Sequence, residues 1–97
     1  MKKHKFVIHE EASNEIIQAY LWYESKQDGL GEKFLDALET CYTAIDINPK
    51  TFEKKYKFQR QAIVRKFPYV VMYEQEGNKI IIYTVFNTHQ QPTGKFR

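Results

Sequence analysis

A change in the spacing of apolar residues near Pro49 constrains the fold of this chain more than any other feature of its sequence. Before Pro49, apolar residues recur with the period of amphipathic helices, which predicts one helix from about residue 11 and a second over 30–47. After Pro49, apolar residues alternate or run on continuously, as they do in strands. These strand-like runs cover 58–65, 69–75 and 79–87.

The links between these segments indicate how they are arranged. The two helices are joined by the short polar stretch 26–29, which makes them antiparallel neighbours. A short strand over 5–9 precedes them, and a polar basic loop over 50–57 follows them. We therefore predict an α+β fold with the order β-α-α-β-β-β. It consists of an N-terminal strand, an antiparallel helical hairpin and a three-stranded antiparallel meander with the hairpin on one face. The run 79–87 is apolar on both faces, which predicts a central strand.

The length and composition narrow the class of protein. Its 97 residues suit a single domain, 1–97. The single cysteine, Cys41, lies within a helical apolar pattern, so we expect a buried inert thiol and a cytoplasmic protein. No apolar run approaches the roughly 20 residues of a membrane span. No residue pattern indicates a metal site or a phosphate-binding loop, and we expect no cofactor.

The charge is divided unevenly between the two halves of the chain. Residues 1–49 carry five Lys or Arg and nine Asp or Glu, a net charge of −4. Residues 50–97 carry ten and three, a net charge of +7. The basic half is consistent with contact to nucleic acid or to an acidic protein segment, and equally with an ordinary solvated surface.

Three basic residues, Arg60, Arg65 and Lys66, fall within or beside the strand-like sequence and are the first candidates for a binding surface. Arg65 interrupts an apolar run, and an arginine that is buried or half-buried requires a partner. That partner could be Glu74 on the facing strand, an acidic residue of another protein, or a phosphate. Trp22 is a further candidate, because tryptophan is enriched in binding hot spots. It could instead pack between helix and sheet beside a core Tyr23.

Several blocks of residues resemble one family in their order and spacing. The blocks are Trp22-Tyr23-Glu24, Gly29-Leu30-Gly31 and Phe34-Leu35; Ile45 with Asn48-Pro49; Arg65-Lys66-Phe67-Pro68-Tyr69 followed by Tyr73; and Val85-Phe86 leading to Gln91-Pro92. Together they cover nearly the whole chain. They resemble the RelE/ParE superfamily of toxins from bacterial type II toxin–antitoxin modules. The sequence is most similar to the ParE-like branch, whose members are often labelled plasmid stabilisation proteins.

The resemblance implies a toxin that forms a hetero-oligomer with a cognate antitoxin, whose C-terminal segment wraps the toxin and masks its working surface. It implies one of two target classes. ParE-like members bind DNA gyrase, whereas RelE-like members cleave messenger RNA on the ribosome. A third interpretation, from another class, is a non-toxic module that binds nucleic acid. For the antitoxin we expect an acidic or mixed amphipathic segment that lies over the helical hairpin and over a basic sheet face formed by Arg60, Arg65 and Lys66.

The nuclease pattern is largely missing from this sequence. In RelE-like nucleases, basic residues alternate along the strand before the hairpin turn, and here only Arg65 matches them. The two preceding positions on that face are Ile63 and Gln61, and Val70 stands near the next expected arginine. His89 could act as an acid or base, because the ordinary pKa of histidine lies near neutrality. The tail also offers Lys95 and Arg97, with Phe96 about where a tyrosine is expected. Arg65 and His89 are thus weak catalytic candidates, and all these cations are candidates for target or antitoxin binding.

Overall fold

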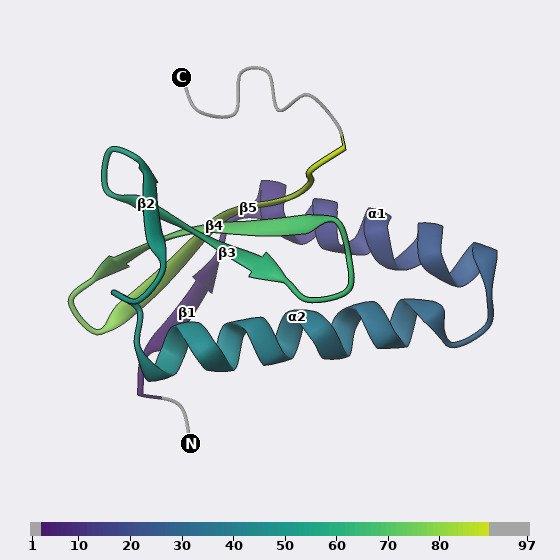
Figure 1. Ribbon diagram of the computed structural model, residues 1–97, viewed down its shortest axis with the longest axis horizontal. Helices are drawn as coiled ribbons and strands as arrows, with labels where there is room; N and C mark the ends of the chain where they lie inside the picture. Colours follow the sequence, from purple (N-terminus) through teal and green to yellow (C-terminus); the bar gives the residue numbers. More distant parts are fainter. Residues whose placement is uncertain (1–2, 90–97) are drawn as a thin grey trace.

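The computed structural model describes residues 3–89 as two helices packed on one face of a five-stranded sheet (Figure 1). The elements along the chain are β1 (Lys5–Ile8), α1 (Glu10–Lys26), α2 (Leu30–Ile47), β2 (Glu53–Tyr56), β3 (Gln59–Val64), β4 (Tyr69–Glu76) and β5 (Lys79–Asn87). The strand order across the sheet is β1-β5-β4-β3-β2. Strand β1 pairs with β5 in parallel, and the other pairs are antiparallel. The predicted α+β fold is confirmed, and β5 has neighbours on both sides as expected.

The meander has one more strand than the sequence indicated. Residues 50–57 were expected to form a loop, but β2 (Glu53–Tyr56) pairs with β3, with Glu53 opposite Gln61 and Lys54 opposite Arg60. This strand lies at the edge of the sheet and buries almost nothing, so it has no apolar alternation that could reveal it. Charged residues are typical of edge strands, because they discourage pairing with another chain.

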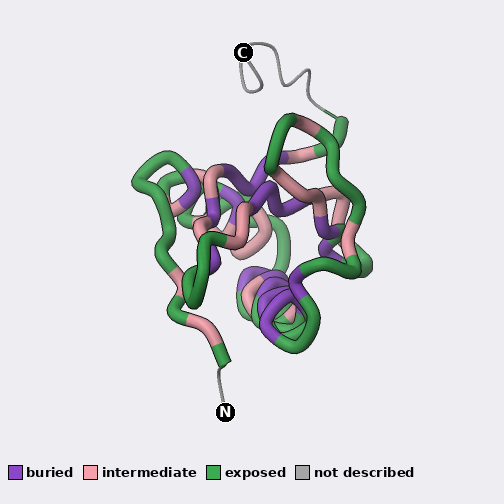
Figure 2. Tube along the Cα trace, turned by 90° about the vertical axis from the view of Figure 1, so that its left-hand side faces the viewer, coloured by how far each residue is buried: buried purple, intermediate pink, exposed green. Residues whose placement is uncertain are grey.

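The core lies between the helical hairpin and one face of the sheet. Phe34 and Ile45 of α2 are completely buried, as are Tyr73, Ile82 and Val85 of the strands that they cover. Figure 2 shows a helix end-on below the sheet, with buried segments facing one another across the interface. Burying side chains of this size contributes about 1.5–3 kcal/mol each, which makes this interface the main source of stability.

The link between the two helices is held by a carboxylate. Glu24, near the end of α1, accepts hydrogen bonds from the backbone N–H groups of Gly29 and Gly31, each at 2.9 Å. These donors belong to the first turn of α2, where backbone N–H groups have no partner within the helix. Gly31 also lies against α1, because a Cβ atom there would approach the Tyr20 ring to 2.7 Å and the Tyr20 carbonyl oxygen to 2.8 Å. The helices can approach this closely only with glycine at position 31.

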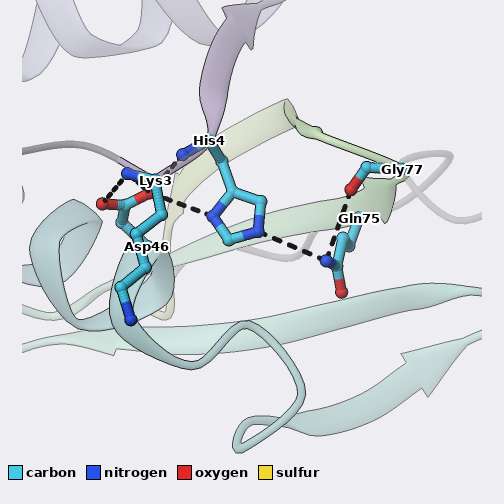
Figure 3. Close-up of polar contacts among 5 residues, drawn as sticks. All are labelled: Lys3, His4, Asp46, Gln75 and Gly77. Atoms are coloured by element: carbon cyan, nitrogen blue, oxygen red, sulfur yellow. Dashed lines mark hydrogen bonds and ion pairs between the residues drawn. The ribbon is translucent and has the colours of Figure 1, made fainter.

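The end of α2 anchors the start of the chain through Asp46 (Figure 3). Its carboxylate accepts hydrogen bonds from the backbone N–H groups of Lys3 and His4 at 2.8 Å each, and His4 Nδ1 lies 3.0 Å from Asp46 Oδ1. On the other side of the imidazole ring, Gln75 Nε2 lies 3.3 Å from His4 Nε2. This chain of contacts connects β1, α2 and β4. Burial alone would raise the pKa of Asp46, but the hydrogen bonds from Lys3 and His4 outweigh it and lower that pKa below its ordinary value.

The Asp46 contacts generate a prediction about pH. Since the pKa of Asp46 is lower in the folded chain than in the unfolded chain, its contribution is complete above the ordinary pKa of about 4 and is lost as the pH falls through the folded value. We expect Asp46→Asn to lower the urea midpoint at pH 7, and the difference from the unaltered protein to shrink as the pH falls below about 4. Asp36→Asn, which removes an exposed carboxylate of the same helix, is the control. A difference that stays constant over this pH range would contradict the assigned role.

The close approach of the helices at Gly31 generates a second prediction. We expect Gly31→Ala to lower the free energy of unfolding by at least about 1–3 kcal/mol, because the added methyl group meets backbone and not only a movable side chain. Denaturant unfolding monitored by circular dichroism measures the change. Glu32→Ala, at the next and exposed position, should stay within about 0.5 kcal/mol of the unaltered protein. Equal stabilities for the two variants would show that the approach to Tyr20 does not constrain the hairpin.

Candidate functional site

The turn between β3 and β4 carries the first two candidate cations. Strand β3 ends at Val64, so Arg65 and Lys66 lie in the turn with exposed side chains. The expectation that Arg65 interrupts a strand is therefore wrong. Lys66 has φ +71°, a left-handed conformation that is uncommon for residues other than glycine. The turn is held by Phe67, whose ring packs 5.0 Å from Tyr23 and 5.4 Å from Phe34, measured between centroids.

The end of β5 brings His89 to the same part of the molecule. Thr88 donates a backbone hydrogen bond of 2.7 Å to the carbonyl oxygen of Pro68, within the β3–β4 turn. The next residue, His89, is exposed, and its backbone N–H donates to the Asn87 side chain at 2.7 Å. Arg65, Lys66 and His89 therefore share one end of the sheet, which we call the turn end.

Arg60 lies at the other end of β3 and has a different role. It stands opposite Tyr73, whereas Val64, just before Arg65, stands opposite Tyr69. Five residues of strand place Arg60 roughly 16 Å from Arg65, at about 3.3 Å per residue. The Arg60 Nη1 atom donates hydrogen bonds to the carbonyl oxygens of Phe52 at 2.7 Å and Lys50 at 3.3 Å.

The prediction that Arg60, Arg65 and Lys66 form one basic sheet face is therefore wrong. Arg60 fastens the loop that follows α2, while Arg65 and Lys66 extend from a turn. The alternation of side chains along a strand could have shown that Arg60 and Arg65 do not share a face. Positions 60, 62 and 64 lie on one face, and Ala62 and Val64 are buried against the helices there.

Glu74 is not the partner of Arg65. Its carboxylate accepts a hydrogen bond of 2.9 Å from the Tyr83 hydroxyl. Glu74 stands opposite Ile81 near the far end of β4, so it is remote from the turn that carries Arg65. No acidic partner of Arg65 is found within residues 3–89, which leaves the Arg65 guanidinium available to another molecule.

Trp22 lies on the outer side of α1, with 56% of its surface exposed. The neighbouring Tyr23 packs in the aromatic core, as expected, but Trp22 does not pack between helix and sheet. Lys26 lies over the Trp22 ring, with Nζ 4.1 Å from the centroid. Ile17 and Leu21 are also exposed on α1, at the i and i+4 spacing that places them side by side. Neither residue was predicted from the sequence as part of a surface, although their i, i+4 spacing is visible there.

The face of the sheet away from the helices carries a small apolar cluster. Val70, Met72 and Phe86 are buried together there. Beside them Ile63, opposite Val70 in the sheet, is 66% exposed. We call these four residues the far-face cluster. Two of its members, Ile63 and Val70, stand where the resemblance to RelE-like nucleases leads us to expect cations, and the cluster is apolar instead.

Two of the candidate cations, Lys95 and Arg97, lie outside the described residues. Cys41 is buried, and burial raises the pKa of its thiol to about 11, so that it is protonated at neutral pH. Between residues 3 and 89, no three His, Cys, Asp or Glu side chains are grouped so that they could hold a metal ion. Neither helix of this described part is long and apolar enough to cross a membrane.

Comparisons with known proteins agree with this fold. The family model described as the ParE toxin of type II toxin–antitoxin systems, parDE, matches residues 6–92. A chain in a solved structure of the chromosomal ParDE toxin–antitoxin system from P. aeruginosa has the same fold, with a TM-score of 0.63 and 14% sequence identity. The superposition covers 88% of this chain and 96% of that chain. A search of curated proteins finds no match. The family match includes the turn end and all four residues of the far-face cluster.

Proposed function

The chain belongs to the family of ParE toxins from type II toxin–antitoxin systems, and we propose that it acts by binding a macromolecular target and is neutralised by a cognate antitoxin. DNA gyrase is the target to test first, because gyrase binding is what the resemblance to the ParE-like branch implies. The working surface in this proposal is the far-face cluster together with the turn end. The antitoxin covers that surface when the toxin is held inactive.

The exposure of Ile63 is the observation that carries this proposal. An isoleucine with 66% of its surface exposed, beside three buried apolar residues, is suited to insertion into a protein partner. Arg65 and Lys66 follow Ile63 two and three positions later in the chain and add charge at the rim of this surface. Charges in that position govern orientation and association rate, while the apolar contacts contribute most of the affinity.

One observation favours the alternative of a RelE-like ribosome-dependent nuclease. Arg65, Lys66 and His89 share the turn end, so a cation that could stabilise a phosphorane and a candidate acid or base occur together. RNA cleavage also needs groups to position the ribose and phosphate. The adjacent sheet positions that could supply them are Gln61, Ile63 and Val70, and two of these three are apolar. The binding mechanism accounts for this apolar face, whereas the nuclease mechanism does not.

A first experiment distinguishes the three interpretations. We expect induced expression of the chain in a bacterial host to arrest growth, and co-expression of the protein encoded beside its gene to restore growth. A non-toxic nucleic-acid-binding module would cause no arrest. If growth stops, purified chain should inhibit DNA supercoiling by gyrase and leave ribosome-bound messenger RNA intact. Cleavage of that RNA, abolished by Arg65→Ala, would establish the nuclease instead.

A second experiment tests the working surface. We expect Ile63→Asp to abolish growth arrest, because a buried carboxylate without a partner strongly disfavours an apolar interface. Ile47→Asp is the matched control, because Ile47 is 63% exposed but lies at the end of α2, away from the far-face cluster. Circular dichroism should show both variants folded. Full toxicity of Ile63→Asp would exclude the far-face cluster from the working surface.

A further inference from the structure

The hairpin formed by β2 and β3 is a second surface, which the proposed toxin activity does not use. Figure 1 shows its turn extending from the sheet on the side away from the helices. The turn lies between Tyr56 and Gln59, at the opposite end of β3 from the turn end. From its charge and its exposed aromatic ring, we propose that this hairpin binds single-stranded nucleic acid. Lys54 and Lys57 contact phosphates, and Phe58 stacks on a base.

The hairpin carries cations that no acidic residue neutralises. Arg60 is occupied by the carbonyl oxygens of the preceding loop, and Lys55 lies 3.5 Å from Glu53, the only acidic residue of the hairpin. Lys54 and Lys57 remain, and neither forms an ion pair with any acidic residue of the described chain. Both are exposed, so they keep the mobility that allows lysine to follow a phosphate backbone.

Phe58 is the most exposed of the large apolar side chains that the structure describes, with 71% of its surface accessible. It occupies the second position of the two-residue turn and so contributes almost no core packing. A phenyl ring in this setting is available for base stacking, which tolerates any base sequence because every base has a flat aromatic face.

The backbone conformation of the turn also supports ligand binding by Lys57. Lys57, the first turn residue, has φ +52°, and such hairpin turns usually place glycine, asparagine or aspartate in this conformation. Its Nζ atom lies 5.4 Å from the centroid of the Tyr56 ring, a weak contact that leaves the ammonium charge unneutralised. The Cβ atom of lysine disfavours this left-handed conformation, and the weak contact with Tyr56 does not explain why lysine occupies position 57. Binding of the ammonium group to a ligand explains it.

Two considerations favour nucleic acid over an acidic protein as the partner. Lysine is depleted in protein–protein interfaces, where arginine is preferred because its planar fork binds a carboxylate through two hydrogen bonds. Phosphate binding does not require this fork, and positive side chains interleaved with aromatic rings are the usual composition of single-strand-binding surfaces. In the hairpin, the cations with neither an acidic partner nor a carbonyl partner are the lysines Lys54 and Lys57, and the exposed Phe58 follows Lys57 in the turn.

Fluorescence anisotropy with the purified full-length chain tests the proposal. The probe is fluorescein-labelled oligothymidine of about 20 nucleotides, titrated from about 50 to 200 mM salt. The Lys54→Gln/Lys57→Asn variant removes both lysine charges, and asparagine is chosen at position 57 because it tolerates the left-handed conformation. We expect this variant to reduce the slope of log K against log salt by about 1.4, or 0.7 for each phosphate that the protein no longer neutralises. Phe58→Ala should weaken binding roughly tenfold with little change in slope.

The matched control is Lys33→Gln/Lys79→Gln, which removes the same charge from exposed sites on α2 and β5. Unchanged binding by this control, with weaker binding by both hairpin variants, supports the proposal. Equal weakening in the control and the lysine variant would overturn it, because binding would then follow net charge alone. Absence of binding at the lowest salt, or displacement of the probe by polyglutamate at equal charge concentration, would also overturn it. Growth arrest is a separate measurement, so failure of this proposal leaves the toxin proposal testable.

Discussion

The packing of aromatic rings around Phe34 is the interaction on which the working surface depends. Phe34 is completely buried, and its ring centroid lies 5.5 Å from that of Tyr23, 5.4 Å from Phe67 and 5.1 Å from Tyr69. These rings come from both helices, from the β3–β4 turn and from the start of β4. Aromatic pairs contribute about 0.5–1.5 kcal/mol beyond their burial, so the cluster can hold a turn whose Lys66 is in a disfavoured conformation. The positions of Arg65 and Lys66 thus follow from apolar contacts made by their neighbours.

The residues that identify the family mainly stabilise the fold. Glu24 and Gly31 secure the helical hairpin, and Phe67 secures the turn. Pro49 presents its carbonyl oxygen to the Tyr73 hydroxyl across 2.5 Å, which ties the end of α2 to β4. A match in these positions therefore indicates how the chain folds and which family it belongs to. In the proposed function, the target is recognised by exposed residues such as Ile63, which make little contribution to the core.

The sequence predicted the fold well because apolar periodicity records which side chains are buried. Both helices, four of the five strands and the inner position of β5 followed from that signal. It does not record backbone pairing without burial, which is why β2 was missed. It was also insufficient for the site. Arg60 fastens a loop and Arg65 extends from a turn, because β3 ends one residue before Arg65. Strand alternation already places positions 60 and 65 on opposite faces, but the apolar pattern does not mark where β3 ends.

The folded chain separates in space the acidic first half of the sequence from its basic second half. Within the described residues, the acidic half forms the edge strand β1 and the two helices, which cover one face of the sheet, and the basic half forms strands β2 to β5. An anionic partner approaching in solution is therefore attracted to the sheet side and repelled from the helices before any contact forms. The apolar far-face cluster lies on this attractive side, so charge brings a partner to a surface that then holds it by burial. The hairpin lysines lie at the end of the sheet opposite Arg65 and Lys66, and a partner long enough to reach both ends would span the far-face cluster between them.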